Sequence, residues 1–391
     1  ETPNFRYFNL KGLTDLTFNE YDQLQAVQWP IWTKQQAQEA VEQLYTKGQF
    51  SYNNSKAKFI ATPVIQPAHQ ICNEFPLILN TGRIRDQWHS MTRTGLSANL
   101  SAHRAEPYCE IHPQDALKYG IKEGDLMELK SKWGKCVLRA ILSENIRRGQ
   151  VFAPIHWSDQ FASDARIGKV VNPVVDAISG EPEFKHTPVI IHPFYSQWQG
   201  VFFVRHGFEK VVQSPIEKTV WWSKITTAKA TRYELAERQK FSHSTEHIKA
   251  LIPFQDESFE WLNIADRTAH MSHSVVLKEG QLIACLYIAP KELLPDREWV
   301  ASLFKRERLS AMHRKALLAG QPMSMVNNEG SLVCSCFKVG KNRIIDAIKT
   351  QNISDEKQVT ACLKAGGNCG SCLPEIRGLI KACQIEAATE A

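Results

Sequence analysis

Residues 81–95 have the sequence Thr-Gly-Arg-Ile-Arg-Asp-Gln-Trp-His-Ser-Met-Thr-Arg-Thr-Gly and directly follow a short apolar run at 75–79. The apolar run predicts a buried strand, so the polar stretch begins where that strand ends. Gly82 permits close approach of the backbone to a ligand, and the hydroxyl and amide groups can bind phosphate oxygens. Arg83 and Arg93 can neutralise phosphate charge with paired hydrogen bonds. The stretch therefore predicts a site for an anionic, nucleotide-like cofactor.

The same stretch also offers groups that can bind a ring system. Asp86 or Gln87 can bind the edge of a purine or pterin, and Trp88 can cover its face. The candidate cofactor-binding residues here are Thr81, Gly82, Arg83, Asp86, Gln87, Trp88, His89, Ser90, Thr92, Arg93 and Thr94. The alternative is a solvated polar loop between strands, and composition alone favours that alternative.

Short strands dominate residues 71–197, the best candidate for an autonomous domain. The expected strands cover 75–79, 110–111, 126–130, 135–142, 151–154 and 189–191. Lys132-Trp133-Gly134 is typical of a hairpin turn. Many short strands with few helices predict a β-barrel rather than a parallel doubly wound sheet.

The rest of the chain is divided into three further segments. Residues 1–70 are expected to be a lead-in from an upstream domain, and 198–330 an α+β bridging region that ends in a polar linker. Within the bridging region we expect a strand at 201–204, a hairpin around Glu279-Gly280, and helices at 233–239 and 299–318. Residues 331–391 are expected to form a small helical domain.

Four cysteines in the last segment have the most specific spacing in the chain. Cys334 and Cys336 form a C-x-C pair, and Cys369 and Cys372 form a C-x-x-C pair. A [2Fe–2S] cluster requires four thiolates, so the number fits. The alternatives are zinc, for which a C-x-C pair is tight, and disulfides, for which no signal peptide is visible.

The helical pattern around these cysteines predicts a compact frame. Ile344, Ile345 and Ile348 form an apolar stripe, Ser354 is a candidate N-cap, and Gly366 a candidate helix stop. Pro374 can open a third helix. The remaining cysteines are expected to be buried structural residues: Cys72, Cys109, Cys136, Cys285, Cys362 and Cys383.

The overall composition is ordinary for a globular protein. The chain has 391 residues, 43% of them hydrophobic, and a formal net charge of +6. No apolar run is long enough to cross a bilayer, and no basic stripe suggests nucleic acid, so neither membrane nor nucleic-acid partners are expected. Ten cysteines without a secretory signal favour the reducing cytoplasm.

Two motif sets resemble known families. Residues 332–382 resemble the [2Fe–2S] domain of bacterioferritin-associated ferredoxin. Residues 81–95, with 112–116, 151–163 and 179–188, resemble the C-terminal molybdopterin-dinucleotide-binding domain of the molybdenum oxidoreductases, above all the assimilatory nitrate reductases. The resemblance implies a double-psi β-barrel. It also implies that residues 81–95, with His156, Trp157 and Lys185, contact the cofactor or the substrate funnel.

The departures from this family are also informative. Related nitrate reductases can carry an asparagine where this chain has Gly168, and Asn172 could replace it. The family's N-terminal [4Fe–4S] cysteines, its molybdenum-ligating residue and its first pterin-binding domains have no counterpart here. We therefore expect the C-terminal part of a longer enzyme, inactive alone and without an assignable catalytic residue.

The resemblance implies a function for the complete enzyme. It would hold molybdenum between two molybdopterin guanine dinucleotides and reduce nitrate to nitrite. A flavoprotein, ferredoxin or flavodoxin would donate electrons through the [2Fe–2S] cluster, and they would continue through the upstream [4Fe–4S] cluster. The alternatives are a non-catalytic electron-transfer or cofactor-binding subunit, and another molybdopterin oxidoreductase such as a formate dehydrogenase.

Overall fold

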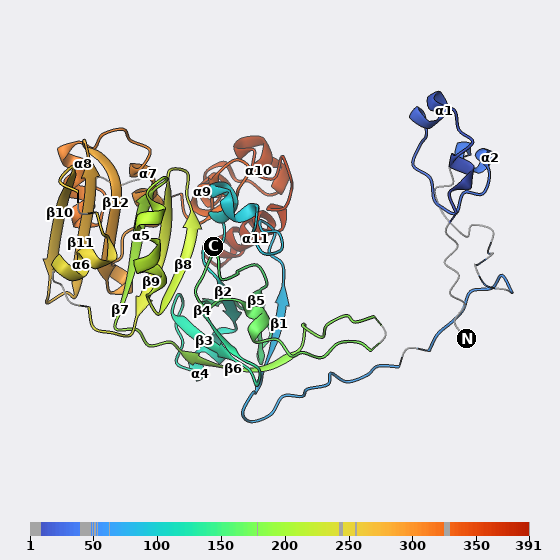
Figure 1. The fold of residues 1–391 in the computed structure, drawn as a ribbon, viewed down its shortest axis with the longest axis horizontal. Helices are drawn as coiled ribbons and strands as arrows, with labels where there is room; N and C mark the ends of the chain where they lie inside the picture. Colours follow the sequence, from blue (N-terminus) through green and yellow to red (C-terminus); the bar gives the residue numbers. More distant parts are fainter. Residues whose placement is uncertain are drawn as a thin grey trace. The chain divides into compact units, whose positions relative to one another are not determined.

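The computed structural model describes residues 9–39, 48, 50, 52, 54–61, 63–177, 179–241, 245–254, 256–323 and 329–390. The chain divides into two compact units, residues 1–66 and residues 67–391. The first unit contains short helical turns, whereas the second contains two sheets of six strands and a helical C-terminal segment (Figure 1). The expected domain limits at 70, 197 and 330 stay predictions.

The helices and strands of the described residues have the following bounds. The helical elements are η1 (Lys11–Leu13), α1 (Phe18–Asp22), α2 (Lys34–Gln38), η2 (Thr94–Leu96), α3 (Ala98–Ser101), α4 (Pro113–Lys118), η3 (Ile167–Lys169), α5 (Glu209–Glu217), α6 (Thr245–Leu251), η4 (Lys291–Leu293), α7 (Arg297–Leu303), α8 (Ala311–Ala319), α9 (Lys341–Gln351), α10 (Glu356–Leu363) and α11 (Leu373–Glu390). The strands are β1 (Leu77–Gly82), β2 (Tyr108–Ile111), β3 (Leu126–Lys130), β4 (Lys135–Leu142), β5 (Gln150–Pro154), β6 (Thr187–Pro193), β7 (Trp198–Arg205), β8 (Trp221–Thr226), β9 (Ala230–Glu237), β10 (Phe259–Asp266), β11 (Met271–Lys278), β12 (Gln281–Ala289), β13 (Leu332–Cys334) and β14 (Val339–Gly340).

The first six strands of residues 67–391 close into a barrel, as the sequence predicts. Their order is β1-β5-β2-β4-β3-β6. The pairs β1·β5 and β2·β4 are parallel, and the other neighbouring pairs are antiparallel. Alternate side chains, such as Leu79, Ile111 and Val151, fill the interior and are fully buried. The expected hairpin at 132–134 joins β3 to β4.

The next six strands form an antiparallel sheet in the order β10-β11-β12-β7-β9-β8. Apolar side chains of α5 and α6 pack in one core cluster of this sheet, and those of α7 and α8 in another. The expected helix at 233–239 is wrong, because these residues belong largely to β9. β9 is almost entirely buried within the sheet, so tertiary packing overrides its helix-favouring composition. The expected helix at 299–318 is two helices, α7 and α8.

The edge strand β8 is hydrogen-bonded to the barrel. The amide of Lys224 donates to the carbonyl of Phe161 at 2.7 Å, and the amide of Ser163 donates to the carbonyl of Trp222 at 3.0 Å. The indole of Trp221, which is fully buried, donates to the carbonyl of Val137 at 3.1 Å. The sheet and the barrel therefore share backbone hydrogen bonds as well as apolar contacts.

Helices α9, α10 and α11 pack around one small core that includes Ile344, Ile348, Ile376 and Ile380. The cap of α10 is Asp355 rather than Ser354, because the Asp355 carboxylate accepts the amides of residues 357 and 358. Lys364, not Gly366, caps the C-terminal end of that helix.

The expected burial of the remaining cysteines is partly confirmed. Cys109, Cys136, Cys285 and Cys383 are buried, but Cys72 and Cys362 are exposed. Cys362 lies on the outer side of α10, where its sulfur accepts a hydrogen bond from Gln351. Burial raises the pKa of the Cys109 and Cys136 thiols well above the ordinary value, which suits inert core residues.

The unit of residues 1–66 is small and is stabilised by local capping. Thr17 with Glu20, and Thr33 with Gln36, form capping boxes at the starts of α1 and α2. Ile31 is buried in this unit.

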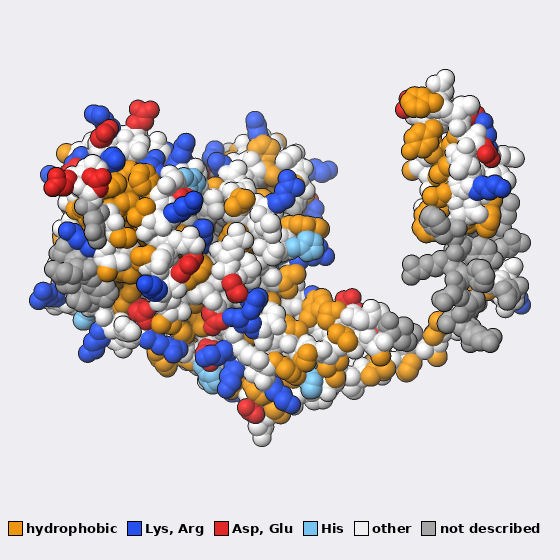
Figure 2. All heavy atoms as spheres, in the orientation of Figure 1, with side chains coloured by type: hydrophobic (Ala, Val, Ile, Leu, Met, Phe, Trp, Pro, Cys, Tyr) orange, Lys and Arg blue, Asp and Glu red, His pale blue; other side chains and the backbone are white. Residues whose placement is uncertain are grey.

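The visible surface carries mixed charge. In Figure 2, basic and acidic side chains are interspersed over the visible face of residues 67–391. Within the described residues, no helix combines the length and the apolar character that crossing a membrane requires.

Candidate functional site

The polar stretch after β1 forms a loop at one end of the barrel. Because β1 and β5 are parallel, Gly82 lies beside Pro154 where both strands end. The exposed guanidinium of Arg83 stacks over the exposed ring of Trp88, 5.3 Å from its centroid. Arg93 is also exposed, and in the described part of the chain neither arginine forms an ion pair with a carboxylate. Two uncompensated positive charges are thus available to an anion.

The buried ring of His156 contacts the backbone of this loop at two points. The His156 ring is completely buried, its Nε2 accepts the amide of Ile84 at 2.9 Å, and its Nδ1 lies 2.6 Å from the carbonyl of His89. Since Nε2 accepts, the proton of the neutral ring must lie on Nδ1, which donates to His89. Burial lowers the pKa of His156, which favours this neutral form. Both ring nitrogens are therefore engaged with the loop backbone.

Lys185 lies at the first residues of the loop. Its ammonium group donates to the carbonyl of Thr81, and the Thr81 hydroxyl donates to the carbonyl of Phe184 at 2.7 Å. A β-carbon added at Gly82 would lie 3.8 Å from Lys185 Nζ, so the cation sits directly beside the glycine. The sequence-predicted residues Thr81, Gly82 and Lys185 are thus brought together, and they place a third positive charge at the loop.

Other candidates point inward. Asp86 is largely buried and contacts Arg85 and His103, and Gln87 is 5% exposed with its Nε2 donating to the carbonyl of Leu100. Trp157 belongs to the barrel core. These side chains shape the loop from within, whereas Trp88, His89, Ser90 and Thr92 are exposed. The hydroxyls of Ser90 and Thr92 lie 3.1 Å apart.

The loop backbone is held in an uncommon conformation. His89 and Met91 have φ values of 40° and 60°. These values lie in the left-handed region, which residues other than glycine rarely adopt. Such residues persist where surrounding contacts fix them, and here His156 bonds His89 directly. The exposed side chains at 88–90 are therefore presented on a fixed frame.

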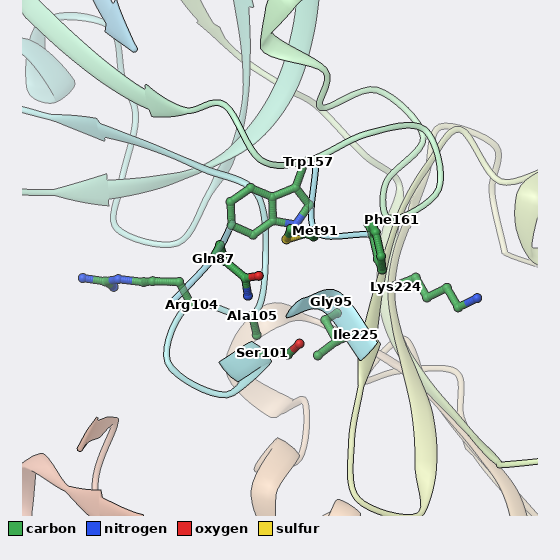
Figure 3. Close-up of a pocket in the computed structure, with 10 residues that line it drawn as sticks. All are labelled: Gln87, Met91, Gly95, Ser101, Arg104, Ala105, Trp157, Phe161, Lys224 and Ile225. Atoms are coloured by element: carbon green, nitrogen blue, oxygen red, sulfur yellow. The ribbon is translucent and has the colours of Figure 1, made fainter. Parts of the chain in front are cut away.

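A small cavity lies under the loop, lined by Gln87, Met91 and Trp157 among others (Figure 3). Its volume is about 10 Å³, which is room for about one water molecule. The unpaired Oε1 of Gln87 is a buried polar atom beside it. A dinucleotide cannot enter this cavity, so the exposed side of the loop is the candidate binding surface.

Asn172 has a structural role. It is buried, its Nδ2 donates to the carbonyls of Glu183 and His186 at 2.8 and 2.9 Å, and its Oδ1 accepts the amide of Val174. Its polar groups are therefore engaged within the protein. A β-carbon at Gly168 would meet no atom within 4 Å, so space for a side chain exists there.

The four cysteines of the C-terminal segment converge as two pairs. The sulfurs of Cys336 and Cys369, both exposed, lie 3.4 Å apart, and the buried thiols of Cys334 and Cys372 are in contact. Each pair combines one cysteine from each motif. Among the described residues, no three His, Cys, Asp or Glu side chains are grouped so that they could hold one metal ion. All four thiols are free, and two pairs of sulfurs suit a cluster in which each of two irons binds two cysteines.

The environments of these thiols differ. A hydrogen bond with Ser371 lowers the pKa of Cys369, whereas burial and the neighbouring Cys334 raise the pKa of Cys372 to about 11. Gly370, with φ of 72°, turns the backbone between the two cysteines. Helix α11 begins directly after Cys372, so its N-terminal dipole favours negative charge on the nearby sulfur.

Sequence reasoning missed Arg85 and His103. Both lie where the loop after β1 meets the cysteine segment: Arg85 donates to the carbonyl of Val333 at 2.6 Å, and His103 Nδ1 lies 2.5 Å from Asp86. No pattern within the sequence signals a contact between residues 248 positions apart. The loop after β1 and the cysteine segment are thus in direct contact.

Two family models match the chain. Residues 77–188 match the molydopterin dinucleotide binding domain, and residues 332–382 match the BFD-like [2Fe-2S] binding domain. The first match contains β1, the whole loop, His156, Trp157 and Lys185. The second contains all four cysteines.

Several relatives are oxidoreductases. A nitrate reductase of Klebsiella oxytoca is 31% identical over 98% of this chain and 42% of its own length. The assimilatory nitrate reductase catalytic subunit of Bacillus subtilis is 31% identical over 46% of this chain and 25% of its own length. Formate dehydrogenase H of Escherichia coli is 26% identical over 50% of this chain and 27% of its own length. The chain thus spans less than half the length of these relatives.

Proposed function

We propose that this chain supplies the dinucleotide-binding and electron-entry parts of a molybdenum-dependent assimilatory nitrate reductase. The observation that carries the proposal is the pairing of a cationic loop at the end of β1 with a four-cysteine segment in direct contact with it. The similarity to nitrate reductases extends over nearly the whole chain, whereas the similarity to formate dehydrogenase H covers half of it.

Three cations of this chain would hold the pyrophosphate of a molybdopterin guanine dinucleotide. Arg83 and Arg93 are exposed on the loop, and Lys185 lies beside Gly82, where the backbone can approach closely. The exposed ring of Trp88 would cover a face of the ligand. His156 would keep the loop in shape without touching the ligand through its ring nitrogens.

The proposed fold of this part is a double-psi barrel. The two parallel pairs β1·β5 and β2·β4 within the closed barrel support that assignment. When bound, the molybdenum bis(molybdopterin guanine dinucleotide) supplies the oxygen-atom transfer, in which nitrate takes two electrons and two protons to give nitrite and water. This chain's residues bind and orient the cofactor.

Cys334, Cys336, Cys369 and Cys372 would bind one [2Fe–2S] cluster inside a small helical domain formed by α9–α11. A flavoprotein, ferredoxin or flavodoxin would donate electrons one at a time, and two exposed cysteines would give a donor access to the cluster. A cytoplasmic location is part of this proposal. It rests on the ten cysteines of the chain, all of which are free thiols.

Iron and acid-labile sulfide analysis of the purified chain tests the cluster. Cys369→Ala should lose both, because it removes one sulfur of the exposed pair. Cys362→Ala is the matched control: it removes another exposed cysteine of the same segment and should keep the cluster. Stoichiometric zinc without sulfide, or equal iron loss in both variants, would contradict the assignment.

Cofactor retention in the complete enzyme tests the loop. Each charge-assisted hydrogen bond contributes about 1.5–3 kcal/mol, so Arg83→Ala or Arg93→Ala should reduce retained dinucleotide about tenfold or more. Arg148→Ala is the control, because Arg148 is an exposed arginine close to Gln150, at the other end of the β1·β5 pair. Equal retention of the dinucleotide in all three variants would show that Arg83 and Arg93 do not bind it.

The substrate is tested with the complete enzyme and a reduced viologen dye. We expect nitrate-dependent oxidation of the dye with one nitrite formed for every two electrons. Formate and an oxidised dye should give no turnover. Formate-dependent dye reduction would instead assign the chain to a formate dehydrogenase.

A further inference from the structure

A network of charged side chains joins the loop after β1 to the cysteine segment. Arg85 is its centre. Its guanidinium donates to the carbonyl of Val333 at 2.6 Å and to the carbonyl of Ser371 at 3.4 Å. The same guanidinium lies 3.3 Å from Asp86 and 3.1 Å from Glu375.

The residues of the cysteine segment that contact Arg85 and Asp86, namely Val333, Ser335 and Ser371, are direct sequence neighbours of the cysteines. Val333 directly precedes Cys334, and Ser371 directly precedes Cys372. Ser335, between the first two cysteines, donates its hydroxyl to Asp86 at 3.3 Å. Arg85 therefore donates to the two peptide carbonyls that directly precede the cysteines of the buried pair.

Three of the four side chains of this network are largely shielded from water, which strengthens their electrostatic effect, whereas the side chain of Glu375 is 39% exposed. The side chains of Arg85, Asp86 and His103 are 18%, 8% and 11% exposed. His103 Nδ1 lies 2.5 Å from a carboxylate oxygen of Asp86, and the other ring nitrogen of His103 lies 3.7 Å from Glu375. Burial would raise the pKa of Asp86, but His103 and Arg85 outweigh it and hold that pKa below its ordinary value. Asp86 is therefore a carboxylate, and Arg85 compensates its charge.

We propose that Arg85 is a positioning residue that docks the cysteine segment on the cofactor loop and raises the reduction potential of the cluster held there. The inference rests on the proposed [2Fe–2S] cluster. One-electron reduction adds a negative charge to the cluster, and a fixed cation beside it favours the reduced form. Without Arg85, the carboxylates of Asp86 and Glu375 would lose the guanidinium that contacts both of them, and their negative charge would oppose reduction.

The position of Arg85 links the proposed dinucleotide site to the buried cysteine pair. Arg85 lies two residues after Arg83, so one short loop carries a proposed phosphate-binding cation and the cation that contacts the cluster segment. Arg85 thus holds the buried cysteine pair toward the dinucleotide-binding end of the barrel. The exposed pair remains available to an electron donor.

A redox titration of the purified chain, monitored by the electron paramagnetic resonance signal of the reduced cluster, tests the proposal. Arg85→Gln should shift the reduction equilibrium about tenfold toward the oxidised form, which is about 59 mV lower for one electron. Arg85→Lys keeps the charge and should stay closer to the wild-type potential. Glu375→Gln removes an opposing charge and should raise the potential.

Lys349→Gln is the matched control, because it removes an exposed cation of the same segment near the end of α9, where Lys349 pairs with Glu386. Its potential should equal that of the wild type. Equal potentials in Arg85→Gln and Lys349→Gln would overturn the proposal, as would equal shifts in Arg85→Gln and Arg85→Lys, which simple loss of packing would produce.

Two further outcomes are also decisive. If Arg85→Gln binds no cluster, Glu375→Gln decides the question, and an unchanged potential there overturns the inference. If the wild-type chain itself holds no iron and sulfide, the proposed cluster fails, and this inference fails with it. If the cluster is present but its reduction potential does not change in Arg85→Gln, this inference is overturned and the proposed cluster still stands.

Discussion

Replacing His156 by alanine should loosen the cofactor loop without unfolding the barrel. The substitution removes hydrogen bonds of 2.9 Å to the amide of Ile84 and 2.6 Å to the carbonyl of His89. An unsatisfied buried polar group costs about 1–3 kcal/mol. Both backbone groups are only partly buried. The lower end of that range, about 1 kcal/mol for each of the two groups, therefore applies, and the loop should lose about 2 kcal/mol of local stability.

Hydrogen exchange at residues 83–95, measured by mass spectrometry, is the suitable assay because it reports local opening. A loss of about 2 kcal/mol corresponds to roughly 30-fold faster exchange. His206→Ala is the control, since His206 is an exposed histidine outside the barrel. The reasoning would be refuted if the loop exchanged equally fast in both variants, or if exchange rose uniformly over the barrel.

The same histidine should make the loop sensitive to acid. Burial lowers the pKa of His156, so the folded loop binds the proton less readily than the unfolded chain does. Its stabilising contribution is therefore complete above the ordinary histidine value of about 6.5 and decreases as the pH falls below it. Exchange at 83–95 should accelerate from about pH 6.5 downward in the wild type. A His156→Ala loop that showed the same acceleration would assign it to another group.

Three further substitutions test the surrounding structure, the first two by urea unfolding and the third by hydrogen exchange. Gly95→Ala should destabilise the chain by about 1–3 kcal/mol, because the added carbon would lie 2.5 Å from the ring of Phe161. Glu234→Gln should cost about 3–5 kcal/mol, since it leaves the cation of Arg297, 3.0 Å away, without its buried partner. Asn172→Ala should release residues 183–187 to faster hydrogen exchange, because it removes the hydrogen bonds to that segment. Wild-type behaviour in any of these variants would contradict the contact concerned.

Local sequence patterns predicted the elements that depend on local chemistry. The β3–β4 hairpin follows from its turn residues, and α9 follows from the spacing of its isoleucines. The helix expected at 233–239 failed because Glu, Leu and Ala favour helices, yet β9 is buried between other strands. There Glu234 lies between Arg297 and Arg232. Burial alone would raise the pKa of Glu234, but the two arginines hold it lower.

In the candidate site, too, local patterns identified some residues, whereas others depend on contacts elsewhere in the chain. Spacing singled out the four cysteines, and the strand-loop pattern singled out Arg83 and Arg93. The pattern did not separate exposed from buried side chains within the loop, because Asp86 and Gln87 contact residues outside it. Gln87 bonds Leu100, and Asp86 contacts His103 and Ser335. Arg85 went unnoticed for the same reason: its partners lie in the C-terminal segment.

The hydrogen bonds between β8 and the barrel bear on how the protein can be divided for expression. An exposed strand edge is a template for pairing with other chains, and the barrel occupies this edge through the carbonyl of Phe161 and the amide of Ser163. The Thr226 hydroxyl also bonds the carbonyl of Gly95, the last residue of the cofactor loop, at 2.8 Å. Residues 198–320, produced without the barrel, would expose that edge and should aggregate. A barrel cut at residue 197 would lose a support of its cofactor loop, so the useful boundary for a shorter soluble product lies after residue 320, beyond the sheet.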